Sequence, residues 1–371
     1  MTAPDLRFAL ELHRRVAGDQ SVGYVWSPYS VASALGLAAA GARGQTLVEI
    51  AAGLGSVDRP ADLAALAAAL AGGADLDAPE EGVPGARIAV ANTLWADRTL
   101  SVAEAYLRAV RDWPGGTARP VDFAGDPGGA RREVNADVER TTNGLIRDLL
   151  GAADVDRETR AILVNALWLR ASWTQAFPVS ATRPLPFHAP GGDVRVPTMQ
   201  LQRQLRYVQR HGWRLASIPG GSGVVADILL PDAGLATAEP ALDPDTLADL
   251  LAAARPVRVA LALPRFRVEG QAGLTQPLGA LGIGLLFTDR ADLSGVTGAE
   301  RLKVSAAVHK AVLTVDEAGL EGAAATALVM RTVSMVVPSR PVEMRVDRPF
   351  LVLVRHEPSG ALYFLARVTH P

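Results

Sequence analysis

Six histidines are the residues best suited to acid–base or metal chemistry in this chain of 371 residues. No two of them stand four residues apart, and no HExxH pattern occurs, so a zinc-binding helix is not expected. GGSG at 220–223 lacks the GxSxG spacing of a hydrolase nucleophile and indicates a hairpin turn instead. The phosphate-binding patterns GxxxxGK(S/T) and GxGxxG after a strand are also missing. We therefore expect no enzymatic activity and no cofactor or metal.

Two acidic stretches could be mistaken for metal-binding loops, at 74–86 and at 288–295. Calcium loops need regularly spaced oxygen ligands, a glycine at the turn and a closing glutamate, and neither stretch has this pattern. We interpret the first as a solvated loop and the second as turn and helix-capping chemistry.

The composition excludes several classes of partner. With a net charge of −2 and a pI of about 6.3, the chain has no general affinity for nucleic acid or acidic membranes. It has no cysteine, which excludes disulfides and thiol chemistry, and no uncharged apolar run of about 18 residues to span a membrane. The N-terminus, MTAPDLRFALELHRR, lacks the features of a signal peptide, so we expect a cytoplasmic protein or a trimmed secreted form.

Hydrophobic periodicity predicts a mixture of helices and strands. The sequence shows no internal repeat and no stretch with the composition of a linker. Ser27 and Ser30 stand where a helix would be capped. Buried strands are expected at 86–96 and 161–173, and strand-like runs dominate the later part of the chain. The architecture expected is therefore one α+β domain over residues 1–371. The helices are expected at 31–55 with a break around Gly41 and Gly44, at 62–73, and at 132–150 with an interruption at Gly144.

The stretch 316–332, DEAGLEGAAATALVMRT, fits no single type of secondary structure. Read with the period of a strand, its even positions from 320 to 330 carry no charge and could face a core. The odd positions carry both charges, Glu321 and Arg331, and could face solvent. Its small residues also suit a helix or a loop, so the stretch is compatible with two states, as a conformational switch requires.

VHKAVLTVDEAGLEGAAATA at 308–327 resembles the hinge and proximal reactive loop of serpins, the serine protease inhibitor family. The resemblance covers nearly the whole chain and implies a serpin fold: one large mixed β-sheet able to accept an extra strand, two smaller sheets and about eight to nine helices. Only two of 37 basic residues are lysines, which indicates coding bias from a high-GC genome, with thermal adaptation as the weaker alternative. We interpret the chain as resembling a bacterial member of the family, and the resemblance implies a hinge of the inhibitory type. The other matching stretches are VWSPYSVASALGLAAAGARGQT, TNGLIRDLL, LVNALWLRASW, TRPLPFH with VPTMQ, GALGIGLLFTDRADLSGV and VDRPFLVLVRH.

The resemblance implies a suicide inhibitor with a reactive loop at about 317–341. A serine protease would attack this loop, form an acyl-enzyme and be trapped when the cleaved loop inserts as an extra strand. Read without the resemblance, His309 and Trp173 are core residues and Ser27 is a helix cap. The implied hinge comprises Glu317, Gly319, Leu320, Glu321, Gly322, Ala323, Ala324, Ala325 and Thr326. The implied shutter, a polar cluster beneath the point where the sheet opens, comprises Ser27, Ser30, Asn165 and His309, and Trp173 marks the breach where the loop enters.

The scissile bond is predicted from the spacing typical of inhibitory serpins. Seventeen residues counted from Glu317 reach Val333, which predicts cleavage between Val333 and Ser334. Counting back from the C-terminal VDRPF stretch points nearer Pro338, so the loop is about five residues longer than in many serpins. The bonds Thr332–Val333 and Met335–Val336 are the nearby alternatives.

The residues around this bond are apolar and medium-sized, which favours a chymotrypsin- or elastase-like target. Arg331 leaves a trypsin-like target open, because the pocket of such an enzyme binds a cation. The expected partner is thus a serine protease, bound covalently to a monomeric inhibitor. The helix near 60–73 has only Arg59 beside it, so no heparin-like activator is expected. Loop insertion between molecules is the expected route to any polymers.

Two hinge positions depart from the pattern of inhibitory serpins. Leu320 stands where a smaller residue is usual, and its bulk is expected to slow the first step of insertion. Gly322 stands where alanine is typical, and glycine weakens a strand by roughly 0.5–1 kcal/mol. Slow insertion would let the acyl-enzyme hydrolyse, so a non-inhibitory serpin with a binding or chaperone-like role is the alternative.

Overall fold

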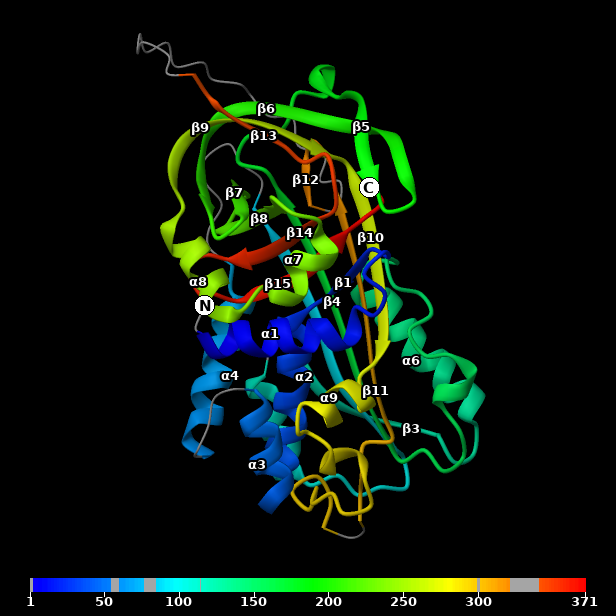
Figure 1. Ribbon diagram of the computed structural model, residues 1–371. Helices are drawn as coiled ribbons and strands as arrows, with labels where there is room; N and C mark the ends of the chain where they lie inside the picture. Colours follow the sequence, from blue (N-terminus) through cyan, green and yellow to red (C-terminus); the bar gives the residue numbers. More distant parts are fainter. Residues whose placement is uncertain (1–2, 55–59, 77–84, 114, 299–300, 321–339) are drawn as a thin grey trace.

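The structure is a computed structural model that describes residues 3–54, 60–76, 85–113, 115–298, 301–320 and 340–371 (Figure 1). The expected α+β architecture is confirmed: helices surround two β-sheets. The α-helices of the described residues are α1 (Ala3–Val16), α2 (Pro28–Gly41), α3 (Gly44–Gly53), α4 (Pro60–Ala74), α5 (Glu104–Ala109), α6 (Pro127–Thr141), α7 (Leu235–Ala241), α8 (Pro244–Ala253) and α9 (Thr275–Ala280).

The larger sheet has nine strands in the described part of the chain, in the order β1-β15-β14-β8-β7-β6-β9-β13, with β5 also paired to β6. Its longest strand, β6, continues through 19 residues and thereby joins two regions that were expected as separate small sheets. The strands are β1 (Tyr24–Trp26), β5 (Arg183–Ala189), β6 (Gly192–Arg210), β7 (Trp213–Pro219), β8 (Val224–Pro231), β9 (Arg255–Pro264), β13 (Val342–Arg345), β14 (Phe350–His356) and β15 (Leu362–Val368).

The second sheet has six strands among the described residues and is mixed, in the order β10-β11-β12-β4-β2-β3. Its central strand β4 is buried on both faces apart from Arg170, as its continuous apolar sequence predicts. Leu163 and Leu167 point into the main core, whereas Ile162 and Val164 pack with α6 on the other face. The strands are β2 (Arg87–Asp97), β3 (Gly116–Val121), β4 (Ala161–Ser172), β10 (Phe266–Gly273), β11 (Ala306–Val315) and β12 (Gly319–Leu320).

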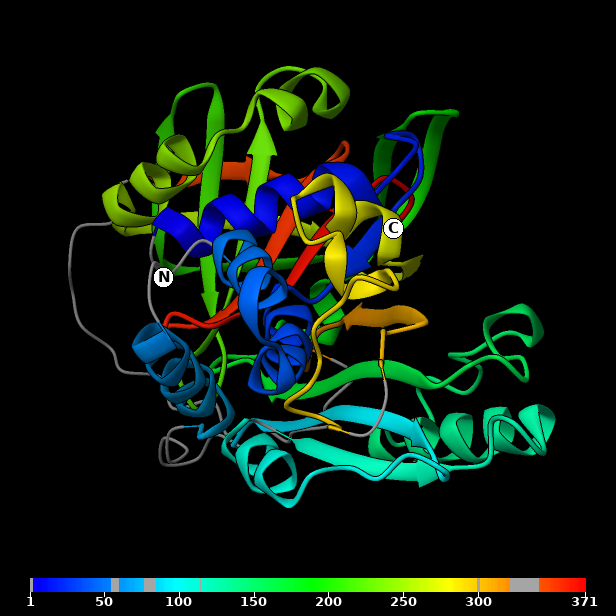
Figure 2. The same cartoon turned by 90° about the horizontal axis from the view of Figure 1, so that it is seen from below.

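Helix α2 is the element that connects the two sheets. It contacts β4 and β2 of the six-stranded sheet and β15 of the nine-stranded sheet, and nearly all of its residues are buried. A helix that is apolar on all sides is stable only in such a core. Its start is fixed by the Ser27 side chain, which accepts a hydrogen bond from the Ser30 backbone N–H at 3.1 Å, and by Pro28 in the first turn. Figures 1 and 2 show α1–α4 gathered together (blue) and α6 standing apart from them.

Most of the predicted elements are confirmed, including the break between α2 and α3 and the hairpin turn at 220–223. The predicted helix at 132–150 is wrong at both ends. Helix α6 begins at Pro127, after the cap residue Asp126, and ends at Thr141. Asn143 and Gly144 have positive φ angles of 51° and 79°, a left-handed geometry that stops a helix.

Candidate functional site

The short strand β12 lies between β4 and β11, at one end of the six-stranded sheet. Gly319 and Leu320 pair with Ser172 and Ala171 of β4, and Leu320 also pairs with Val315 of β11. The Leu320 side chain is 0% exposed. Leu320, where the predicted strand alternation begins, and Gly319 before it are therefore already in the sheet. The core accommodates the Leu320 side chain, whose bulk was expected to slow insertion.

Below β12 the same two strands pair directly with each other. The parallel β4–β11 ladder runs from the pair Ala306–Ile162 to the pair Lys310–Ala166. Strands β4 and β11 are thus separated by β12 at one end and joined at the other. An extra strand entering from β12 would have to break this ladder from Lys310 downward.

Backbone and side-chain contacts of Trp173 fix the segment that leads into β12. Its indole Nε1 donates to the Asp316 carbonyl at 2.8 Å, and its backbone N–H donates to the Ala318 carbonyl at 2.9 Å. The Trp173 ring packs edge to face on Phe177. Trp173, predicted to mark the breach, is in direct contact with the segment that leads into β12.

Glu317 is anchored by an ion pair. Its carboxylate Oε1 accepts hydrogen bonds from Arg265 Nε at 2.7 Å and from the Thr182 hydroxyl. Burial alone would raise the pKa of Glu317, but these hydrogen bonds from Arg265 and Thr182 outweigh it and hold the pKa below its usual value. Since the Glu317 side chain is 8% exposed, its charge is held in place where the chain turns toward β12.

A buried polar cluster ties β4, β11 and the start of α2 together. His309 Nδ1 and Asn165 Oδ1 are 2.9 Å apart, and His309 Nε2 is 3.0 Å from the Ser27 backbone nitrogen. Asn165 Nδ2 donates to the Ser30 carbonyl at 2.6 Å and to the Asn92 side chain of β2. The four predicted shutter residues therefore meet in space, although they are up to 282 positions apart in the chain.

The hydrogen bonds define the charge state of His309. A backbone N–H can only donate, so Nε2 must be the unprotonated acceptor, and the proton is on Nδ1, which donates to Asn165. Complete burial without a counter-ion lowers the pKa of His309 to about 3. The imidazole is therefore neutral, and a second proton on Nε2 would oppose the Ser27 N–H.

Sequence reasoning missed two side chains of this region. Asn92 pairs in register with Asn165 and belongs to the buried cluster, and Arg265 binds Glu317. Asn92 could have been found, since a polar residue occupies a core-facing position in the predicted strand 86–96. Arg265 carried no such signal, because an exposed cation next to a strand is common.

Much of the predicted reactive loop lies outside the described residues. This applies to the hinge residues Glu321, Gly322, Ala323, Ala324, Ala325 and Thr326, and to the predicted bond between Val333 and Ser334.

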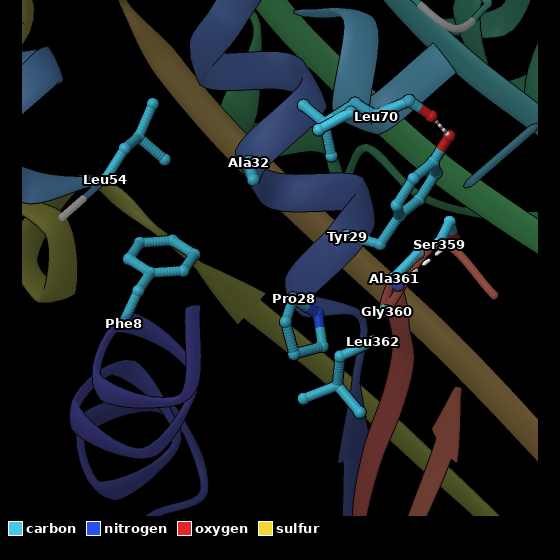
Figure 3. Close-up of a pocket in the computed structure, with 11 residues that line it drawn as sticks. Phe8, Pro28, Tyr29, Ala32, Leu54, Leu70, Ser359, Gly360, Ala361 and Leu362 are labelled. Atoms are coloured by element: carbon cyan, nitrogen blue, oxygen red, sulfur yellow. Dashed lines mark hydrogen bonds between the residues drawn. The ribbon is translucent and has the colours of Figure 1, made fainter. Parts of the chain in front are cut away.

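A separate apolar cavity of about 90 Å³ lies between α1, α2, α4 and the turn before β15 (Figure 3). Phe8, Tyr29 and Leu70 form part of its wall, and the Tyr29 hydroxyl donates to the Leu70 carbonyl at 2.7 Å. No charged side chain of the described residues lines it, so we place no acid–base chemistry there.

The described residues contain no group of three or more His, Cys, Asp or Glu side chains arranged to hold a metal ion. Within the same ranges, no helix has both the length and the apolar character needed to cross a membrane.

The chain matches the family model of serpins, described as serine protease inhibitors, over residues 5–371. It is 32% identical to the leukocyte elastase inhibitor of Bos taurus, covering 100% of this chain and 99% of that protein. It is also 32% identical to a serpin-like protein of Thermococcus kodakarensis, over 98% of this chain and 84% of the relative.

Solved structures show the same fold. Uncleaved ovalbumin superposes with a TM-score of 0.87 at 26% identity, covering 100% of this chain and 99% of that one. Serpin48 of Tenebrio molitor superposes with a TM-score of 0.86 at 27% identity, covering 99% of this chain and 97% of its own. The chain therefore belongs to the serpin family and has the serpin fold, in a family of protease inhibitors.

Proposed function

We propose that this serpin inhibits a serine protease as a suicide substrate, and that residues 1–371 act as one unit carrying a reactive loop at about 317–341. The observation that carries this proposal is the position of β12, which already separates β4 from β11 before any cleavage. A segment that starts inside the sheet can lengthen as a strand without a new nucleation step.

The register of β12 supports insertion past the polar cluster. Leu320 pairs with Ala171 and Val315, so each further residue would move one place down both neighbouring strands. Six residues on, Thr326 would reach Asn165 and His309, which already face each other in the ladder. Because Leu320 points into the core, Thr326 would point the same way and bring a hydroxyl to the polar cluster.

The proposed reaction begins with attack of the protease serine Oγ on the carbonyl carbon of Val333. The Val333–Ser334 peptide bond breaks, the Ser334 nitrogen leaves as an amine after taking a proton from the protease histidine, and Val333 becomes an ester of the protease. Insertion of residues 321–333 would carry this ester about 40 Å along the sheet. Distortion of the protease would then prevent water from hydrolysing the ester.

The target is proposed to be chymotrypsin-like or elastase-like, because the residues around Val333 are apolar. The relatives named leukocyte elastase inhibitor support this choice. Trapping would depend on loop insertion being faster than hydrolysis of the ester. Because the Leu320 side chain is already buried in the sheet before cleavage, its bulk would not slow the insertion of the residues that follow.

The test is to mix the protein with chymotrypsin, and separately with elastase, followed by denaturing gels and intact mass. We expect a complex that survives boiling, at the summed mass less the released C-terminal peptide, whose mass locates the bond. Cleavage without a complex and without a rise in the melting temperature of the cleaved chain would contradict the proposal. That result would support the alternative of a non-inhibitory serpin with a binding or chaperone-like role.

A further inference from the structure

A groove runs along the outer face of the nine-stranded sheet where β6, β9 and β13 lie side by side. Its floor is formed by two small residues of the middle strand, Ala260 and Ala262. Gln202 and Glu343 stand on either side of Ala260, and Gln200 and Arg345 stand on either side of Ala262. Alternation places all six side chains on one face, so the small central residues create the depression.

The charged side chains that line or contact this groove are mainly cationic. Arg345 is 71% exposed and lies 3.3 Å from Glu343, which is the one acid among the described residues lining the groove. Two further guanidinium groups contact the glutamines that line one side of the groove. Arg183 lies 3.3 Å from Gln200, and Arg258 lies 3.0 Å from the side-chain amide of Gln202. Three arginines against one glutamate leave a positive surface that suits carboxylates.

The groove is continuous with the base of the proposed reactive loop. Its wall strand β13 begins at Val342, directly after the loop, and its floor strand β9 is followed by Arg265, which binds Glu317. Figure 1 shows β6, β9 and β13 at the same end of the molecule as β12. Eight residues separate the proposed bond from β13, so the bond lies within about 30 Å of the groove.

A protease docked on the loop would stand over this groove. A serine protease domain of roughly 220 residues has a radius of gyration of about 17 Å, and its surface therefore extends over the neighbouring sheet face. We propose that the groove is a second contact surface for the target protease, and that it selects a protease whose surface loop carries carboxylate side chains. This inference rests on the proposed inhibitory function, because it assigns specificity to the same partner.

The test uses two forms of chymotrypsin with the same active site. One is unmodified, and the other is succinylated as the zymogen before activation, which converts surface amines to carboxylates. The double variant Arg258→Ala/Arg345→Ala removes two cations of the groove. The matched control Arg108→Ala/Arg267→Ala removes two exposed, ion-paired arginines on α5 and β10.

The measured quantity is the second-order rate constant for attack on the loop at low ionic strength, read from protease inhibition or from loop cleavage. With the succinylated enzyme we expect the groove variant to be about tenfold slower and the control variant to change by less than about twofold. Glu343→Gln is expected to raise the rate. With unmodified chymotrypsin, the groove and control variants should differ little.

Docking and trapping are measured by different quantities: the rate constant reports docking, and the stoichiometry of inhibition reports trapping. The number of inhibitor molecules consumed per trapped protease should stay at the parental value in the groove variant, because the hinge is untouched. If the loop is cut, no complex forms and the cleaved chain shows no rise in melting temperature, the inhibitory proposal fails, and the cleavage rates still decide the docking proposal. Equal slowing of the groove and control variants would overturn the docking proposal, and failure of both enzymes to cut within 321–339 would overturn both proposals.

Discussion

His309 on β11 and Asn165 on β4 face each other across the parallel ladder, and the His309 Nδ1–H donates to Asn165 Oδ1 at 2.9 Å. The pair is second from the end of the ladder that adjoins β12. Through His309 and Asn165 the sheet is also bound to the Ser27 N–H and the Ser30 carbonyl at the start of α2. Opening the sheet at this point therefore breaks contacts with the helix as well as between the strands.

Acidification should destabilise the folded chain through His309. The folded-state pKa is about 3, below the ordinary 6.5, so between these values the unfolded chain binds a proton that the folded chain excludes. The stabilisation is complete above pH 6.5 and is lost as the pH falls toward 3. At pH 5 the loss amounts to about 2 kcal/mol.

The measurement is thermal unfolding at one scan rate, at pH 7.5 and pH 5, for the parent and for His309→Gln. We expect the variant to melt lower than the parent at pH 7.5 but to lose less on acidification. Buried His13, whose pKa burial also lowers, is present in both proteins and cancels in the comparison. An equal loss in both proteins would show that His309 does not titrate as described.

Glu317→Gln should loosen the segment that leads into β12, because it removes the ion pair with Arg265. Arg265 is 43% exposed, so solvent screens the interaction, and we expect a cost of about 1 kcal/mol. Glu269→Gln is the matched control, since it breaks an exposed pair with Arg267. Amide exchange at Phe177, whose N–H donates to the Glu317 carbonyl at 2.9 Å, should quicken in the first variant alone.

Gly319→Ala should expel β12 from the sheet. A Cβ at this position would lie 2.1 Å from the Ala171 carbonyl oxygen and 2.8 Å from the Ser172 Cα, so backbone atoms would have to move. Release would also expose Leu320, whose burial contributes about 2 kcal/mol. Gly273→Ala is the control, because a Cβ there meets nothing within 4 Å. Faster hydrogen exchange of the Trp173 amide is expected only in Gly319→Ala. Unchanged exchange in this variant would show that the sheet accommodates the added Cβ without releasing β12.

Two neighbouring loop positions should respond in opposite ways to the same substitution. In the proposed insertion register Thr326 points into the main core, whereas Ala325 points to the opposite face, beside the half-exposed Lys310. Thr326→Arg should bury a charge on insertion and turn the inhibitor into a substrate, with cleavage but little stable complex. Ala325→Arg should keep most of the parental complex formation, because Lys310 at the same level of the sheet shows that a long cationic side chain on this face can reach solvent. The measurement is the ratio of complex to cleaved chain on denaturing gels, and similar ratios for both variants would refute the register.

Local patterns in the sequence were sufficient to predict many helices and strands and where some of them begin or end. The break between α2 and α3 follows from glycines near a helix end, the cap follows from Ser27, and the buried strand β4 follows from an uninterrupted apolar run. Strand alternation also predicted that Leu320 can face a core, where the structure places it. Each of these features depends on a few adjacent residues, whose conformational preferences act wherever the segment lies.

Beyond the four shutter residues that the family resemblance grouped, only the tertiary structure decided which distant groups meet. Asn92 meets Asn165 only because β2 pairs with β4. Arg265 binds Glu317 because the pairing of Phe266 on β10 with Val315 on β11 brings the two adjoining segments together. The union of two expected sheets through β6 and the presence of β12 between β4 and β11 likewise depend on pairing between remote segments. Pairing of this kind is set by competition among all the strands for partners and for burial, and no local pattern of residues records the outcome.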